Sequence, residues 1–108
     1  MRHVLLTFDV EEFDSLLDFD YPSDEEEIFR ISKNGLDKLI GLLNKYKIKA
    51  TFFTTARFAK KYPSLIKIIC KKHEIACHGY SHSDHYKGDI SKINLAKKDM
   101  EKITGWGV

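Results

Sequence analysis

No stretch of this sequence approaches the roughly 18 consecutive apolar residues of a membrane-spanning helix, so we expect no membrane protein of that class. Cysteine is scarce: Cys70 and Cys77 belong to no C-x-x-C pair, and we expect two buried thiols rather than a disulfide. Internal repeats and low-complexity linkers are also absent, which favours one domain over residues 1–108. Because no signal-peptide pattern follows Met1, we expect a cytoplasmic chain.

A strong charge of one sign is absent as well. Eighteen basic and sixteen acidic residues leave a net charge of +2, which is too mild to predict a nucleic-acid partner. The two signs are unevenly distributed, with acids gathered between Glu11 and Glu27 and lysines dominating from Lys33 onward. This pattern predicts an acidic loop beside a lysine-rich helical surface.

Apolar runs alternate with amphipathic segments along the chain. The first run, Val4 to Val10, is apolar on both sides, which is typical of a strand covered on both faces of a parallel sheet. We expect strands at residues 4–10, 48–55 and 74–77, and helices at 36–46, 56–62, 63–70 and 93–103. The last helix should be capped by Asp89 or Ser91 and should end at Gly105. The alternation predicts an α/β fold with parallel strands, either an open sheet or part of a barrel.

Residues 13–34 are the least regular part of the sequence. Scattered acids here predict a long loop that enters the first helix with Ser32 or Asn34 as its cap. The spacing of the acids does not match a calcium-binding loop. A solvated loop is the first interpretation, and the alternative is that Phe13, Phe19 and Tyr21 cover a site at the end of the first strand.

Two acids and two histidines fall where strands should end. Asp9 and Glu11 are two residues apart, so in a strand their side chains project to the same face. His78 and His82 are four apart, and one helical turn would aim both rings at one point. Because the carboxyl ends of parallel strands share one edge, we expect all four side chains there.

The chemistry of this set favours a hydrolytic metal site. Two imidazoles and the carboxylate of Glu11 would bind a divalent metal with open positions and leave Asp9 as the base. The attacked group would be an ester or amide carbonyl. The plainer alternative is that the two acids only solvate the end of a strand.

Three segments resemble motifs of the polysaccharide deacetylases with the NodB-homology domain, carbohydrate esterase family 4. Thr7-Phe8-Asp9-Val10-Glu11 is similar to the first motif, Lys49-Ala50-Thr51-Phe52-Phe53 to the second strand, and His78-Gly79-Tyr80-Ser81-His82 to the metal-binding H-x-x-x-H motif.

The resemblance covers nearly the whole chain and implies a partial (β/α) barrel of the NodB type. It implies Asp9 as catalytic base and Glu11, His78 and His82 as ligands of a divalent metal. Zinc is the metal we expect, with cobalt, nickel and manganese as alternatives. The implied activity is hydrolytic removal of N- or O-acetyl groups from a polysaccharide or a related amide.

The sequence departs from the family pattern at two points. Many members have two adjacent acids, whereas here Val10 separates Asp9 from Glu11, as a valine does in the branch that includes peptidoglycan deacetylase-like and allantoinase-like enzymes. Glu11 also has a longer side chain than an aspartate and so reaches further toward a metal. Members also continue with an arginine–proline motif, further strands and a late histidine that serves as general acid. We therefore expect residues 1–108 to be the amino-terminal half of the domain, and whether this half is active alone stays open. Two alternatives stay open: a non-catalytic metal-binding or interaction fragment, and an allantoinase-like cyclic amide hydrolase.

An incomplete sheet would leave a strand edge without a partner. The third strand, Glu74 to Cys77, would expose backbone groups and apolar side chains such as Ile75. We therefore expect a homo-oligomer or a complementary subunit, with a carbohydrate or small amide as substrate.

Overall fold

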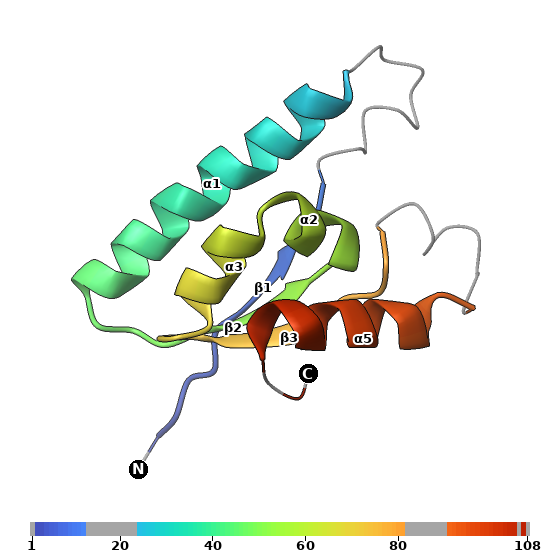
Figure 1. The fold of residues 1–108 in the computed structure, drawn as a ribbon. Helices are drawn as coiled ribbons and strands as arrows, with labels where there is room; N and C mark the ends of the chain where they lie inside the picture. The colour runs from blue at the N-terminus through green and yellow to red at the C-terminus, as the bar shows by residue number, and fades with distance from the viewer. Residues whose placement is uncertain (1, 13–23, 82–90, 106, 108) are drawn as a thin grey trace.

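The computed structural model describes residues 2–12, 24–81, 91–105 and 107 and contains a parallel three-stranded sheet (Figure 1). The strands are β1 (Thr7–Val10), β2 (Thr51–Thr54) and β3 (Glu74–Cys77), in the order β1-β2-β3. Thr7 pairs with Thr51 and Thr51 with Glu74, so the three strands start and end in register. This confirms the predicted α/β fold with parallel strands.

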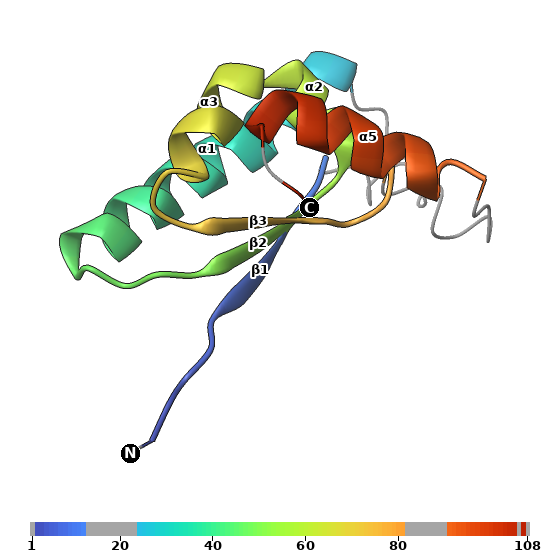
Figure 2. The same ribbon diagram turned by 60° about the horizontal axis from the view of Figure 1, so that its bottom comes forward.

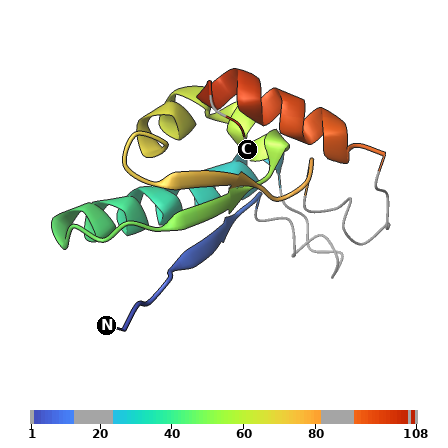
Figure 3. The ribbon, with the colours of Figure 1, turned by 90° about the horizontal axis from the view of Figure 1, so that it is seen from below.

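Helices α1 (Glu25–Lys45), α2 (Ala56–Lys61), α3 (Pro63–Ile69) and α5 (Ile93–Thr104) lie on one side of the sheet (Figure 2). Seen from below, the strands lie nearest the viewer with no described helix in front of them (Figure 3). Crossovers of one hand between successive neighbouring strands place their helices on the same face, which explains this arrangement.

The covered face of the sheet forms the core. The stacked rings of Phe8 and Phe52, 5.6 Å apart, lie on it, and Ile75 is 7% exposed. The opposite face carries Asp9, Phe53 and Ala76, which are exposed or half-buried. The expectation of a first strand covered on both faces is therefore wrong for the described residues, since they place no second layer there. The expectation that Ile75 is exposed is also wrong, because its side chain points to the helical face.

The first strand is shorter than predicted. Val4 and Leu5 are 83% and 90% exposed, and only the carbonyl of Leu6 joins the sheet, as acceptor from Thr51 N at 3.0 Å. Since β2 begins at Thr51, the residues before Thr7 have no strand beside them.

The first helix begins earlier than predicted. Asp24 caps α1 through a hydrogen bond from Glu26 N to its carboxylate at 2.8 Å, so residues 24–34 are not a loop and neither Ser32 nor Asn34 is the cap. Three glutamates in the first turn complement the positive end of the helix dipole. Ile28 and Phe29, each 3% exposed, attach this turn to the core. The predicted aromatic cover from Phe13, Phe19 and Tyr21 lies outside the described residues.

The last helix confirms its predicted end and corrects its start. Gly105 terminates α5 with φ of 77°, in the left-handed region that glycine adopts without strain. The cap residue is Lys92, which makes no side-chain cap, so Ser91 is not the cap, and Asp89 lies outside the described residues. Cys70 and Cys77 are free thiols as expected but only partly buried. In the described part of the chain, no helix has the length and apolarity needed to cross a membrane.

A buried carboxylate joins the end of β1 to the start of α2. Glu12 is 1% exposed, and the hydroxyl of Thr55 donates to its Oε2 at 2.9 Å. The same hydroxyl accepts from Phe58 N at 3.2 Å and so caps α2. Arg57 Nη1 lies 3.8 Å from Glu12 Oε1, while Arg57 Nη2 donates to Glu25 Oε1 at 2.8 Å. We call Glu12, Thr55 and Arg57 the Glu12 cluster.

This cluster fixes the ends of β1 and β2 and the first turn of α1 relative to one another. Burying a carboxylate is costly unless hydrogen bonds and opposite charge compensate it. The Thr55 hydroxyl, as both donor and acceptor, supplies one of these bonds and the helix cap together.

We predict that Thr55→Val destabilises the chain by about 2–4 kcal/mol, because it removes the cap of α2 and one donor to a buried carboxylate. Thr55→Ser keeps the hydroxyl and should cost only about 1 kcal/mol for the lost methyl group. Urea unfolding followed by circular dichroism measures both free energies. Equal losses for the two variants would show that the hydroxyl contributes nothing.

Candidate active site

Glu11, Thr55 and His78 form a row immediately beyond the ends of the three strands. Thr55 N donates to Val10 O at 3.0 Å, and His78 N donates to Thr54 O at 2.9 Å, so the hydrogen-bond ladder continues past each strand. The period of two along a strand places Asp9 and Glu11 on the uncovered face of the sheet. The row therefore brings residues from three distant segments to one edge.

The side chains of Asp9, Glu11 and His78 converge as predicted. His78 Nε2 lies 2.9 Å from Glu11 Oε2 and 4.0 Å from Asp9 Oδ2. Glu11 and His78 are half-buried, with side chains 28% and 25% exposed, whereas the Asp9 side chain is 63% exposed. One imidazole nitrogen thus faces two carboxylates that differ in their access to water.

The loop after β3 is held by the first turn of α2. Ala56 N donates to Gly79 O at 3.0 Å and Arg57 N to Tyr80 O at 2.8 Å, so two amides at the helix start find partners in this loop. Gly79 has φ of 76°, a conformation that side chains disfavour. Residues 78–81 therefore form an irregular bend and do not begin the helical turn that would aim the rings of both histidines at one point. His82 lies outside the described residues.

The donors present suit a borderline-soft divalent metal. An imidazole nitrogen and a carboxylate oxygen are ligands that zinc prefers, and each would lie about 2 Å from it. The 2.9 Å separation of His78 Nε2 and Glu11 Oε2 is short enough for both atoms to bind one cation. Within residues 2–12, 24–81 and 91–105, however, no group of three histidine, cysteine or acidic side chains could hold a metal ion. A complete site would need a further ligand, which is the role predicted for His82.

A groove extends from the two acids along α1. It has a volume of about 320 Å³ and is lined by residues 8–11, which include Asp9 and Glu11, and by residues of α1 that include Ile31, Leu36 and Leu39. The groove gives a molecule bound beside Asp9 an apolar surface to contact.

Sequence reasoning missed Glu12 as a residue that supports the site. It stands next to Glu11 in the chain, yet its carboxylate turns into the protein while that of Glu11 turns toward His78. The only sequence signal was a third acid directly after an apolar strand, followed later by a threonine before a helix.

Comparisons with known proteins agree on one family. The polysaccharide deacetylase family model matches residues 1–106. The peptidoglycan-N-acetylglucosamine deacetylase of Bacillus cereus is 31% identical over 101 residues, which are 82% of this chain and 36% of the relative. The peptidoglycan-N-acetylmuramic acid deacetylase PdaA of Bacillus subtilis is 29% identical over 94 residues, 75% of this chain and 35% of the relative. The chain thus spans about a third of the length of these curated relatives.

A solved structure shows the same fold. The peptidoglycan deacetylase PdaC of Bacillus subtilis superposes with a TM-score of 0.65 and 25% identity, covering 95% of this chain and 44% of that chain. The family match over almost every residue agrees with the parallel sheet and with the motifs that end its strands. The chain belongs to the polysaccharide deacetylase family, in the NodB-homology class.

Proposed function

We propose that this chain carries the metal- and base-bearing part of a hydrolase that removes N- or O-acetyl groups from a polysaccharide. The observation that supports this most directly is the convergence of Asp9, Glu11 and His78 at the carboxyl ends of β1 and β3. Family relatives whose names state peptidoglycan deacetylation make an N-acetylated sugar the substrate class to test first. The cytoplasmic location suggested by the sequence stays a prediction.

Glu11 and His78, together with His82, are the proposed ligands of a divalent metal. Zinc fits imidazole and carboxylate donors best, and cobalt, nickel or manganese would bind the same set. When bound, such a cation supplies Lewis acidity toward a carbonyl oxygen and toward water.

Asp9 is the proposed general base. Its carboxylate lies 4.0 Å from His78 Nε2 and is 63% exposed, so water can reach Asp9 beside the proposed ligands. A carboxylate here can accept the proton that water loses when it attacks an acetyl carbonyl. The leaving amine also needs a proton, and within the described residues we assign no group to that role. We propose that this acid comes from outside these residues.

We predict that zinc binds the purified chain and that Glu11→Gln and His78→Gln each weaken the binding. Each substitution should lower the zinc affinity by more than about tenfold to hundredfold. That is the loss expected when the replaced residue only hydrogen-bonds to a ligand and does not bind the metal itself. Asp9→Asn should keep zinc binding but lower acetate release from acetylated chitin oligomers by about 10²–10⁴-fold, because only the base is lost. Calorimetry and an acetate assay with added zinc measure the two effects.

Asp37→Asn is the matched control, since Asp37 lies on the exposed face of α1 and pairs with Lys33 at 2.8 Å. Zinc binding without acetate release by the unaltered chain would favour the alternative of a non-catalytic metal-binding fragment. Binding that survives both ligand substitutions would reject Glu11 and His78 as ligands.

We also propose that the uncovered face of the sheet associates with a second copy of this chain or with a complementary subunit. The described helices cover only one face, and both β1 and β3 are edge strands. The uncovered face carries the half-buried ring of Phe53, and Val4 and Leu5 extend beyond β1 almost fully exposed. Open edges and exposed apolar side chains favour association.

We predict a dimer or larger species in sedimentation at micromolar concentration. Phe53→Lys should shift the chain toward monomer, because a buried ammonium on the uncovered face would oppose association. Tyr46→Lys, which changes a 61% exposed ring at the end of α1, is the control and should leave the distribution unchanged. A compact monomer for the unaltered chain would contradict the proposal.

A further inference from the structure

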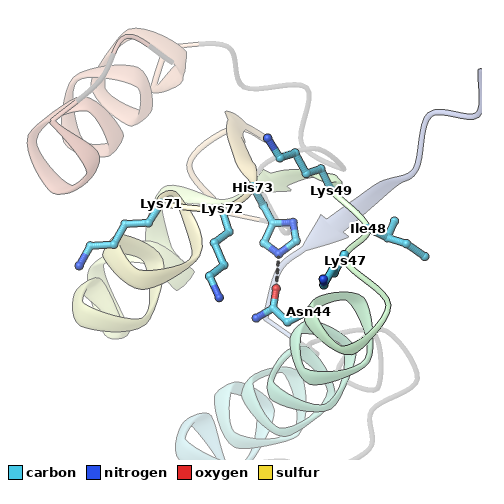
Figure 4. Close-up of a pocket in the computed structure, with 7 residues that line it drawn as sticks. All are labelled: Asn44, Lys47, Ile48, Lys49, Lys71, Lys72 and His73. Atoms are coloured by element: carbon cyan, nitrogen blue, oxygen red, sulfur yellow. Dashed lines mark hydrogen bonds between the residues drawn. The ribbon is translucent and has the colours of Figure 1, made fainter.

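A second cavity lies at the opposite end of the sheet from Asp9, where β2 and β3 begin. It has a volume of about 320 Å³ and is formed by the end of α1, the segment before β2 and the segment before β3 (Figure 4). Its lining residues are Asn44, Lys47, Ile48, Lys49, Lys71, Lys72 and His73. We call it the lysine pocket.

The lysine pocket concentrates positive charge. Four of its seven lining residues are lysines and none is acidic, and no ion pair of these four lysines occurs within the described part of the chain. Glu74, at the start of β3, is the nearest acid in sequence and lies within hydrogen-bond distance of the Thr51 hydroxyl at 3.5 Å. The ends of α1 and α3 contribute roughly half a negative charge each. Figure 4 shows the side chains of Lys49 and Lys71 leading away from His73 and Asn44, so Lys47 and Lys72 are the lysines that offset this charge beside Asn44.

His73 and Asn44 give the pocket a fixed polar wall. Ala50 N donates to His73 Nδ1 at 3.2 Å, so the ring proton is on Nε2, which donates to Asn44 Oδ1 at 3.0 Å. Burial lowers the pKa of His73, and the charges of Lys72 and Lys49 lower it further, which keeps this neutral tautomer. Because the carbonyl oxygen of Asn44 is engaged, its amide nitrogen is the atom offered to a ligand, and Figure 4 shows it on the side of Lys72.

Lys47 occupies a backbone position that usually holds glycine. It follows the end of α1 with φ of 55°, in the left-handed region that residues with a side chain rarely adopt. The turn is closed by hydrogen bonds from Lys47 N to Asn44 O at 3.2 Å and from Ile48 N to Leu43 O at 2.9 Å. The chain therefore has a lysine at a position where glycine would suit the backbone better.

We propose that the lysine pocket binds a compact polyanion bearing phosphate groups. Lysine ammonium groups act as mobile point charges that suit phosphate oxygens, and the Asn44 amide adds a donor of fixed direction. The cavity is large enough for a short chain of phosphate groups, and its wall presents donors without a competing carboxylate. The phosphate could belong to a free anion or to a lipid headgroup, which experiment distinguishes. The inference does not depend on the proposed deacetylase activity.

Titration of the full chain with inorganic tripolyphosphate, followed by amide NMR shifts, tests the proposal. We expect saturable shifts centred on Lys47, Ala50, Lys72 and His73, with affinity that falls as salt rises. Vesicles of phosphatidylglycerol, compared with phosphatidylcholine vesicles, form the second arm. Binding to vesicles but weakly to tripolyphosphate would assign the phosphate to a headgroup, and the reverse would assign it to a free anion.

Three substitutions test the individual donors. Lys47→Gly relieves the left-handed backbone, so it should leave the melting temperature unchanged or raised while weakening binding about tenfold. Lys72→Gln should weaken binding by a similar factor, and Asn44→Asp, which still accepts from His73 but adds a negative charge, should abolish it. Lys98→Gln in α5, outside the pocket, is the control and should bind as the unaltered chain does.

Two results would overturn the proposal. The first is no binding of either tripolyphosphate or phosphatidylglycerol vesicles at low salt. The second is that Lys98→Gln loses as much affinity as Lys47→Gly or Lys72→Gln, while the chemical-shift changes spread over lysines elsewhere. This result would show only a general attraction of the anion to a basic surface.

Discussion

Two backbone hydrogen bonds beyond the strand ends connect the three segments of the candidate site. Thr55 N bonds to Val10 O and His78 N to Thr54 O, which carries the parallel register one residue past each strand. The register therefore decides that Glu11 and His78 reach the same edge, although 67 positions separate them in the chain. A slip of one residue in either strand pair would turn one of these side chains to the helical face.

The Glu12 cluster supports this register from the side of the core. Glu12 turns inward to Thr55 and Arg57 while Glu11 turns outward to His78, so two adjacent acids have opposite structural roles. The guanidinium of Arg57 also lies over the ring of Phe29, 5.1 Å from its centroid, and bonds to Glu25. A single arginine thus contacts residues on both sides of the segment between β1 and α1.

The parts of the structure that depend on local pattern could be predicted from the sequence. The aromatic and β-branched run of β2, the glycine that ends α5 and the acids after β1 are signals within a few residues of the features they specify. The start of α1 was missed because the run Glu25 to Glu27 resembles solvated loop, and only the cap at Asp24 and the burial of Ile28 reveal a helix. Burial of Glu12 depends on the hydroxyl of Thr55, 43 positions away in the chain. The lysine pocket joins two segments separated by more than 20 residues. Neither feature therefore leaves a signal in the local sequence.

The strand order β1-β2-β3 is also the order of the chain, and this has a kinetic consequence. Each strand adds to the edge left by the one before, so no pairing waits for a later segment to be synthesised. Domains that form from the amino terminus during translation can use such an order, since each new strand pairs with one that has already been synthesised. The pair β1-β2 already fixes Asp9 and Glu11, but His78 arrives only when β3 docks. The convergence of these three side chains therefore requires the docking of β3, the last of the three described strands in the chain.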